Sequence, residues 1–337
     1  MYEESHLRMA LDNWDTVDYH QKKTIGDFEI FFKDAGHILG SAIVEVVDLD
    51  SKKKIVFTGD LGNTPTPLLR DTEKITDADY LVMESVYGDR NHEEREQRKH
   101  KLQEIIKKVI GRGGTLLVPV FSLEKTQVFL KELNDMIEDG KVPSVPVFFD
   151  SPLGIRLTEV YGKYTHLFND SVQKEIQAGD DIFDFPKLKM TLRKQESDAI
   201  IKNDGPKIII ASSGMSDGGR IMAHEKRYLG NTKNAIVFIG YQVAGSFGRR
   251  IQDGVKSLNI EKTDVRVRAD VFTVSGYSSH KDSNGLMDFV EGSTGTLKKV
   301  FVVMGETKSA LYLTQKLRDF LEVDAVVPDL NEVVNLN

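Results

Sequence analysis

The sequence predicts an α/β protein with α+β elements, in which a β-rich first part is followed by a parallel sheet flanked by helices. Two observations predict this fold class. In the middle of the chain, strands that are apolar throughout alternate with helices, which is typical of a parallel sheet covered on both faces. Nearer the start, shorter strand-like runs follow one another across short turns. A length of 337 residues accommodates one large domain or two ordinary ones.

The β-rich part comes first along the chain. Residues 1–26 are polar, and the spacing of Leu7, Ala10, Leu11 and Trp14 favours a helix there. Alternating apolar runs then predict strands at residues 28–32, 42–47, 54–58 and 80–83. A charged amphipathic helix is predicted over residues 92–110, and the glycines that follow it end the helix.

The next part alternates strand and helix. Strands are predicted at residues 115–121, 145–149, 207–211 and 234–240. Helices are predicted at residues 127–136, from about residue 153, and at 219–228. The last part adds strands at 265–274, 299–303 and 324–327, with helices between and after the first two. Since no long linker interrupts this order, we expect two closely packed lobes.

Composition excludes several classes of site. The chain has no cysteine, so it can form neither a disulfide framework nor a thiolate metal site, and any zinc must be held by histidines and carboxylates. No apolar run approaches the roughly 20 residues of a membrane-spanning helix, and no signal-peptide pattern opens the chain. These features predict a cytoplasmic protein that has no membrane partner. The net charge of -7 argues mildly against a nucleic-acid partner, but a cleft can be locally basic beneath outer carboxylates.

Four short segments at the ends of predicted strands combine a turn with a histidine or a carboxylate, a position where side chains are displayed for function. They are Ala-Gly-His-Ile-Leu-Gly-Ser (35–41), Phe-Thr-Gly-Asp (57–60), Met-Glu-Ser-Val-Tyr-Gly (83–88) and Ser-Ser-His-Lys-Asp (278–282). By residue type, His37 and Asp60 are candidate zinc ligands. Taken singly, a structural histidine and a turn aspartate explain them as well.

In this order the four segments resemble motifs of the β-CASP branch of the metallo-β-lactamase family. The first two resemble metal motifs of that fold, and the last two resemble β-CASP motifs A and B, which contain Glu84 and His280. Residues 150–153, 211–215 with 218–220, and 240–242 with 248–250 resemble the inserted β-CASP domain. The resemblance covers essentially the whole chain. It is closest to the branch that holds the endonuclease subunit cleaving pre-mRNA 3′ ends, with its bacterial and archaeal relatives.

The resemblance implies a partial metallo-β-lactamase αββα lobe with an inserted β-CASP domain built on the parallel sheet. Residues 1–90 would form the first, truncated part of the metallo-β-lactamase lobe. Residues 91–275 would form the β-CASP domain, and residues 276–337 would return to the first lobe.

The resemblance also implies a zinc-dependent RNA phosphodiester hydrolase with two zinc ions in a cleft between the lobes. Such metal pairs clamp both oxygens of an in-line phosphoryl displacement. His37 would bind one zinc, and Asp60 would bridge both. His280 would protonate the leaving oxygen while Glu84 orients it, because a carboxylate partner fixes the imidazole tautomer and raises its pKa for acid catalysis.

Further residues are candidates for contact with RNA. Lys125, Arg220 and Arg249 would contact phosphates along the cleft, and solvated surface charges are the alternative interpretation. The loop that holds Ser212 and Ser213 follows a strand and precedes a helix. That arrangement suits phosphate contact through backbone N–H groups.

The sequence departs from the family pattern in two places. The family's main metal motif is His-x-His-x-Asp-His, yet no two histidines here lie two residues apart; they occur at positions 6, 20, 37, 92, 100, 166, 224 and 280. Where nucleases of this branch usually have a histidine ligand, the sequence has Met304, and a thioether suits copper rather than zinc. We therefore expect this chain alone to bind zinc weakly or not at all.

Several interpretations stay open. The chain could be a fragment, half of a split gene, or a degenerate relative. Its function could be that of a ribonuclease or the C-terminal part of one, that of a non-catalytic RNA- or partner-binding relative, or hydrolysis of a small ester by a lone metal. Retention of Glu84 and His280 favours the first. An exposed edge is expected in the first sheet, so a homodimer or a complementing N-terminal half is a candidate partner besides RNA.

Overall fold

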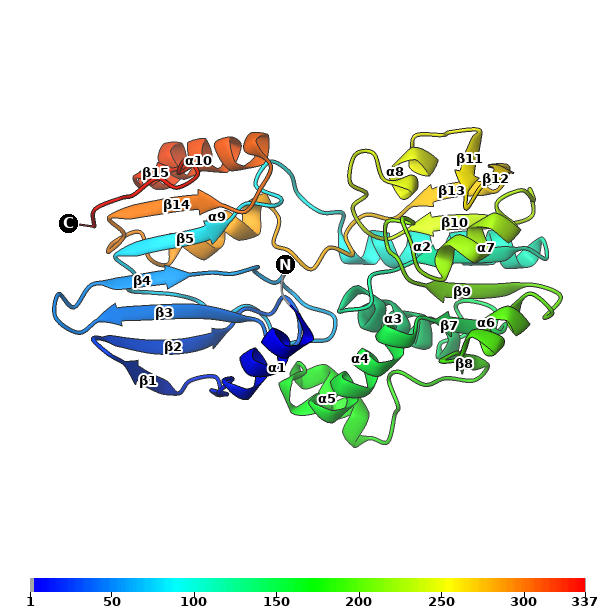
Figure 1. The fold of residues 1–337 in the computed structure, drawn as a ribbon, viewed down its shortest axis with the longest axis horizontal. Helices are drawn as coiled ribbons and strands as arrows, with labels where there is room; N and C mark the ends of the chain where they lie inside the picture. The colour runs from blue at the N-terminus through cyan, green and yellow to red at the C-terminus, as the bar shows by residue number, and fades with distance from the viewer. Residues whose placement is uncertain (1–2, 337) are drawn as a thin grey trace.

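Two sheets organise the computed structural model, which describes residues 3–336, and each sheet forms the centre of one lobe (Figure 1). The first lobe has a seven-stranded sheet in the order β1-β2-β3-β4-β5-β14-β15. Its strands are β1 (Lys22–Ile25), β2 (Phe28–Asp34), β3 (Ala42–Asp48), β4 (Lys54–Phe57), β5 (Tyr80–Glu84), β14 (Lys299–Val303) and β15 (Ala325–Val326). Strands β1 to β4 are antiparallel neighbours, whereas β4, β5, β14 and β15 run parallel.

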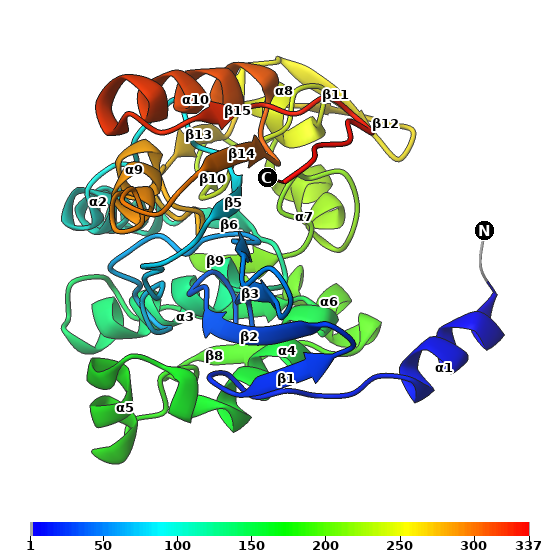
Figure 2. The same cartoon turned by 90° about the vertical axis from the view of Figure 1, so that its left-hand side faces the viewer.

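One face of this sheet is covered by α9 (Ser283–Glu291) and α10 (Thr307–Leu321). Ile43, Leu81 and Val302 point from three strands into that core, where they meet Leu286 of α9 and Leu313 of α10. Helix α1 (Glu4–Asp12) is formed as its apolar spacing predicts, but it buries no residue and projects away from the body (Figure 2).

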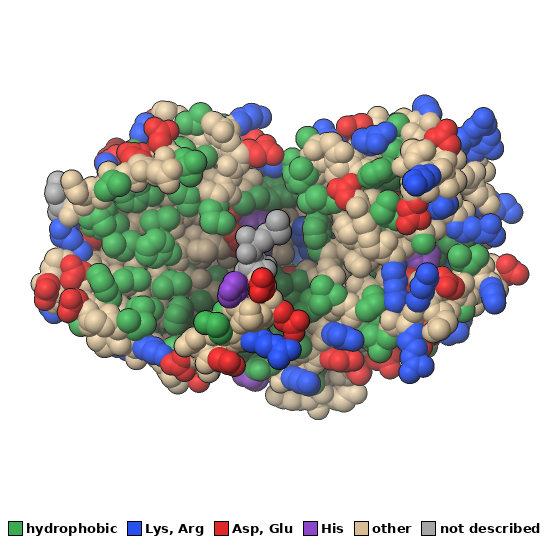
Figure 3. All heavy atoms as spheres, viewed as in Figure 1, with side chains coloured by type: hydrophobic (Ala, Val, Ile, Leu, Met, Phe, Trp, Pro, Cys, Tyr) green, Lys and Arg blue, Asp and Glu red, His purple; other side chains and the backbone are tan. Residues whose placement is uncertain are grey.

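The opposite face of the seven-stranded sheet is apolar and largely uncovered. The strand register places on this face the following side chains, all half-buried or exposed: Ile25, Phe28, Ile30, Phe32, Val44, Val46, Ile55, Phe57, Val82 and Val303. Figure 3 shows a broad hydrophobic surface on this lobe. We call this set the open sheet face. The exposed sheet edge expected from the sequence is present at β1. The open sheet face is a second uncovered surface of the same sheet.

The second lobe contains a six-stranded sheet in the order β13-β10-β6-β9-β7-β8, and every neighbouring pair is parallel. Its strands are β6 (Thr115–Pro119), β7 (Val147–Asp150), β8 (Leu188–Met190), β9 (Lys207–Ala211), β10 (Ala235–Phe238) and β13 (Asp270–Thr273). The central strands β6, β9 and β10 are buried at every position, which explains their continuous apolar runs. The parallel sheet that the sequence predicts is confirmed.

Helices cover both faces of this second sheet. They are α2 (Arg95–Gly111), α3 (Lys125–Glu138), α4 (Pro152–Lys163), η1 (Thr165–Leu167), α5 (Asp170–Gln177), α6 (Lys194–Ile200), α7 (Ile221–Tyr228) and α8 (Phe247–Gln252). One core joins α2, α3 and α4 to the sheet, and a separate core on the other face joins α7, α8 and the hairpin of β11 (Ser257–Ile260) with β12 (Thr263–Arg266). Two layers of helix therefore enclose one layer of strands.

One predicted strand is wrong. Residues 265–274 do not form a single strand, because the chain breaks after β12 and re-enters the parallel sheet only at β13. At the break, the N–H groups of Arg268 and Ala269 both donate to the carbonyl of Leu229, at 2.8 and 2.9 Å. These N–H groups are used by the contact with Leu229, so the backbone can extend neither the β11–β12 hairpin nor the pairing of β13 with β10.

The lobes are joined by more than the two chain crossings. Leu68 and Leu69, from the loop between β4 and β5, are buried in a core of the second lobe. The N–H of Asn169 donates to the carbonyl of Leu68 at 3.0 Å, and Leu69 forms an isolated bridge with Phe168. Within residues 3–336, no helix is both long enough and apolar enough to cross a membrane. The domain boundaries at residues 90 and 275 stay a prediction.

Candidate active site between the lobes

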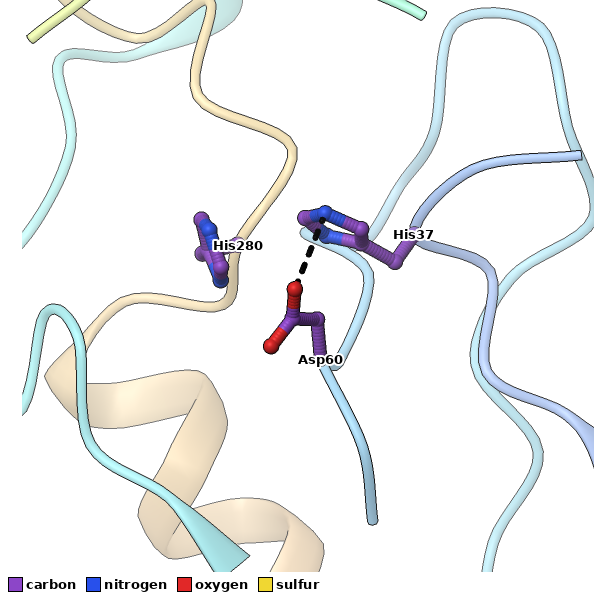
Figure 4. A group of neighbouring side chains, drawn as sticks. All are labelled: His37, Asp60 and His280. Carbon is purple, nitrogen blue, oxygen red and sulfur yellow. Dashed lines mark ion pairs between the residues drawn. The ribbon is translucent and has the colours of Figure 1, made fainter. Parts of the chain in front are cut away.

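Three predicted site residues from separate parts of the chain meet between the lobes. His37, Asp60 and His280 each offer a ligand atom within 4.8 Å of the others, and Figure 4 shows their side chains converging. Nε2 of His37 lies 3.7 Å from Oδ2 of Asp60, and the two imidazole rings are 4.4 Å apart. Within residues 3–336, no other cluster of three such donors occurs. We call these residues the three-donor group.

Local folding brings the first two of these residues together. His37 lies in the turn between β2 and β3, where the N–H of Gly36 donates to Asp34 at 2.8 Å. Gly36 has a φ of 63°, which L side chains rarely adopt. Gly62, two residues after Asp60, packs so closely that a Cβ there would lie 2.0 Å from the carbonyl oxygen of Gly36. Glycine is therefore required where the two ligand loops touch.

His280 reaches the site on a segment that follows β13. This segment forms an isolated bridge between His280 and Gly62, and Asn63 donates its N–H to the carbonyl of Ser279 at 2.7 Å. The same loop that presents Asp60 thus also anchors His280. The third donor is placed by backbone contacts between segments far apart in the sequence.

Glu84 holds the imidazole of His280. Glu84 ends β5 with 1% of its surface exposed, and Nδ1–H of His280 donates to its two oxygens at 3.0 and 3.1 Å. The N–H of Leu61 also donates to Glu84, at 2.6 Å. The predicted pairing is present, and because Nδ1 is bonded to Glu84, Nε2 is the ring nitrogen that stays available for chemistry. The catalytic roles of the pair stay a prediction.

Two residues of the three-donor group, His37 and Asp60, fit a zinc ion. Burial and the neighbouring charge of His280 lower the pKa of His37 to about 4, so its imidazole is neutral at pH 7, the form that binds metal. Nδ1 of His37 is buried without a hydrogen-bond partner. The imidazole of His37 and the carboxylate of Asp60 are both ligand types that zinc takes.

Lys125, at the start of α3, brings a cation to the same place. It lines both cavities that flank the three-donor group, of about 260 and 520 Å³. Burial lowers the pKa of Lys125 to about 8, so the ammonium form still dominates at pH 7. Within residues 3–336 no carboxylate pairs with it. Its position is compatible with the predicted phosphate contact, which stays a prediction.

Arg220, a second predicted phosphate contact, is engaged inside the second lobe. Its guanidinium donates to Asp150 at 2.6 Å and to the carbonyls of Thr191 and Leu192, each at 2.8 Å. Burial raises the pKa of Asp150, but hydrogen bonds outweigh this effect and lower the pKa to about 2. The hydrogen bond with His224 contributes most to the lowering. Arg220 therefore organises the ends of β7 and β8, and its contact with RNA stays a prediction.

The remaining predicted residues lie around the cleft or away from it. Arg249 pairs with Asp253 at 3.0 Å. In the loop that holds Ser212 and Ser213, the N–H of Ser213 donates to Gly218 at 3.3 Å, so it is already used. Met304 lines the larger cavity together with His280 but is not part of the three-donor group. The RNA contacts predicted for these residues remain untested.

Two residues near the site were not predicted from the sequence. Nε2–H of His92 donates to the carbonyl of His280 at 2.9 Å, and its ring packs edge-on against Tyr87 at 4.5 Å. His92 lies 188 residues from His280 in a run of charged residues, so no motif signals it. Tyr241, from the loop after β10, donates its O–H to Glu306 of the first lobe at 3.0 Å. It spans the cleft from the second lobe.

A contact between the lobes also supports the turn of His37. Tyr161 of α4 donates its O–H to Glu124 at 2.5 Å and accepts the N–H of Leu39 at 3.2 Å. Leu39 belongs to the turn that presents His37. The second lobe thereby holds a ligand loop of the first.

Two family models match parts of this chain. The family model of the Beta-Casp domain matches residues 126–251, and that of the Zn-dependent metallo-hydrolase RNA specificity domain matches residues 264–328. A protein of unknown function from Enterococcus faecalis V583 has a similar fold, with a TM-score of 0.52, 12% identity, and coverage of 93% of this chain and 65% of that one.

Curated relatives match nearly the whole chain. Ribonuclease TTHA0252 of Thermus thermophilus is 32% identical over 91% of this chain and 70% of its own length. An RNase J-like protein of Methanocaldococcus jannaschii is 30% identical over 97% and 76%. The transcription termination factor FttA of Methanosarcina mazei is 30% identical over 96%, but the chain spans only 52% of that relative. The chain belongs to the β-CASP family of metallo-β-lactamase-fold ribonucleases.

Proposed function

We propose that this chain is a zinc-dependent RNA phosphodiester hydrolase, or the C-terminal part of one, acting in the cytoplasm. The observation that carries the proposal is the oriented His280–Glu84 pair, which faces His37 and Asp60 at the base of a cleft. A module that only binds RNA has no need of an imidazole oriented by a buried carboxylate. The unpaired cation of Lys125 in the same cleft suits a phosphodiester substrate.

The proposed mechanism divides the work among four side chains. His37 and Asp60 would hold zinc, which supplies Lewis-acid activation of water and of a phosphoryl oxygen. Glu84 accepts a hydrogen bond from Nδ1–H of His280 and stabilises the imidazolium, whose Nε2–H would give its proton to the leaving oxygen. Lys125 offsets the negative charge that the phosphoryl oxygens carry.

The test is zinc content by plasma mass spectrometry together with cleavage of an end-labelled single-stranded RNA. After the wild type has been loaded with zinc, His37→Ala should lose zinc and cleavage together, and a loaded wild type that retains no zinc would overturn zinc-dependent hydrolysis by this chain alone. His280→Ala should retain zinc while cleavage falls by at least about 100-fold, because it removes the general acid. His100→Ala, at an exposed position on α2, is the matched control and should change neither quantity.

Two outcomes would revise the proposal. Loss of zinc in His280→Ala would make His280 a ligand, since its Nε2 faces the other two donors. A zinc-loaded wild-type chain that binds RNA without cleaving it would favour the alternative function, a non-catalytic RNA- or partner-binding relative. That alternative is supported by Met304, which stands 65% exposed where this branch usually has a histidine ligand.

We further propose a protein partner at the open sheet face. Its apolar side chains remain in contact with water, and surfaces of this kind mark association sites. A complementing N-terminal half would cover this face and bring further histidines to the three-donor group. A homodimer through the same face is the competing arrangement.

A further inference from the structure

The larger of the two cavities beside the three-donor group has a distinct chemistry. Its volume is about 520 Å³, within the range of small-ligand sites. The apolar and aromatic side chains in its lining are Val86, Tyr87, Phe121, Met215, Tyr241 and Met304. His280 is part of the same lining, so the cavity opens directly beside the proposed acid.

Cations lie against the aromatic rings of this cavity. The guanidinium of Arg90 is 4.8 Å from the ring centre of Tyr87 and 5.9 Å from that of Tyr241. The ammonium of Lys125 is 4.9 Å from the ring centre of Phe121. Aromatic faces interleaved with Lys and Arg are the surface that binds single-stranded nucleic acid, because bases stack on the rings while the cations contact phosphates.

Two apolar side chains at the mouth of the cavity are unusually exposed. Tyr241 is 40% exposed and Met304 65% exposed. The O–H of Tyr241 donates to the carboxylate of Glu306 at 3.0 Å, and this hydrogen bond holds the Tyr241 ring across the mouth of the cavity. Met304 is held on the facing lobe with a φ of 59°, and its polarisable thioether is well suited to contact a flat π-system.

We propose that this cavity is a nucleobase subsite for the nucleotide that carries the leaving oxygen. The inference rests on the proposed function, because it takes His280 as the group that protonates this oxygen. The base packs between Tyr241 and Met304, and Lys125 contacts the adjoining phosphate. Stacking tolerates any base, so the subsite positions the RNA without reading its sequence.

The experiment measures the affinity of a fluorescent single-stranded RNA 10-mer by anisotropy, with a chelator present to prevent cleavage. We expect Tyr241→Ala to weaken binding about tenfold, the loss typical of one stacked base. Tyr241→Phe keeps the ring but loses its hydrogen bond to Glu306, so it should weaken binding far less than Tyr241→Ala does. Met304→Ala should weaken binding less. Tyr312→Ala, which removes a half-exposed tyrosine of α10 outside the cleft, is the control.

An abasic series locates the base. One abasic nucleotide is moved along the 10-mer, and the wild type should lose affinity when it reaches a single position. Tyr241→Ala should show no loss at that position, because a shared partner makes the two changes non-additive. If the wild type binds RNA but Tyr241→Ala matches Tyr312→Ala, the subsite is wrong while the proposed function stands. If the wild type binds no RNA, both are overturned.

Discussion

At the scale of single residues, Glu124 is a carboxyl group buried beside the turn of His37. It is buried at the start of α3 with a φ of 57°, and its partner is the O–H of Tyr161. Burial raises the pKa of Glu124 to about 8, although the hydrogen bond from Tyr161 opposes the shift. The carboxyl is therefore largely protonated at neutral pH, and it holds Tyr161 against the turn of His37.

This pKa predicts a pH dependence of stability. Since the pKa rises from 4.5 to about 8 on folding, the contribution of Glu124 is fully present below pH 4.5 and is lost as the pH rises toward 8. Glu124→Gln should remove this pH-dependent loss of stability. Between pH 5 and 8 the free energy of unfolding of the variant should therefore rise, relative to that of the wild type, by on the order of 3 kcal/mol. Urea unfolding across this range measures it, with exposed Glu159→Gln as control. Parallel curves for the wild type and Glu124→Gln would refute the assignment.

At the scale of elements, the residues of the site could be predicted from the sequence, but the way their loops pack together could not. His37, Asp60, Glu84 and His280 could be predicted one by one, because each lies at the end of a strand or in the loop after one and matches a motif of the family. Their arrangement could not be predicted from the pattern alone. It depends on the contact of Gly62 with the turn before His37, which has no local periodicity.

That contact predicts the effect of a single methyl group. Gly62→Ala would place Cβ against the backbone of Gly36, so the two ligand loops must separate. We expect the free energy of unfolding to fall by about 2–3 kcal/mol and zinc to be lost from the three-donor group. Gly111→Ala is the matched control, since a Cβ there meets nothing within 4 Å. Thermal unfolding and zinc content measure both variants. If Gly62→Ala matches Gly111→Ala in stability and zinc content, the two loops can move apart without loss of the site.

At the scale of the whole molecule, the parallel sheet was predictable and the small elements were not. β6, β9 and β10 are buried on both faces, and burial of this kind leaves a continuous apolar run in the sequence. β1, β8 and the hairpin of β11 and β12 were missed because they are short and no more than half of the residues in any of these strands are buried, so few of their positions need to be apolar. The open sheet face was also missed, since alternation cannot tell a covered face from an uncovered one.

The open sheet face predicts association that depends on concentration. Val44→Glu places a charge in the middle of this face without touching the core below. We expect the wild type to bind a hydrophobic dye and to gain mass with rising concentration, and Val44→Glu to do both less. Light scattering and dye fluorescence measure this, with Leu153→Glu, an exposed position on α4, as the control. A wild type that stays monomeric and binds no dye would remove the basis for a partner at this face.

The burial of Leu68 and Leu69 in the opposite lobe has a consequence for how this architecture can be inherited. The two leucines come from the first lobe, yet they complete the interior of the second. Excising the second lobe at its chain crossings would leave two holes, each costing about 2–5 kcal/mol unless the surroundings collapse. The second lobe therefore cannot be transferred to another protein without losing part of its core. A gene rearrangement that moved it to another host would have to carry the short leucine segment with it.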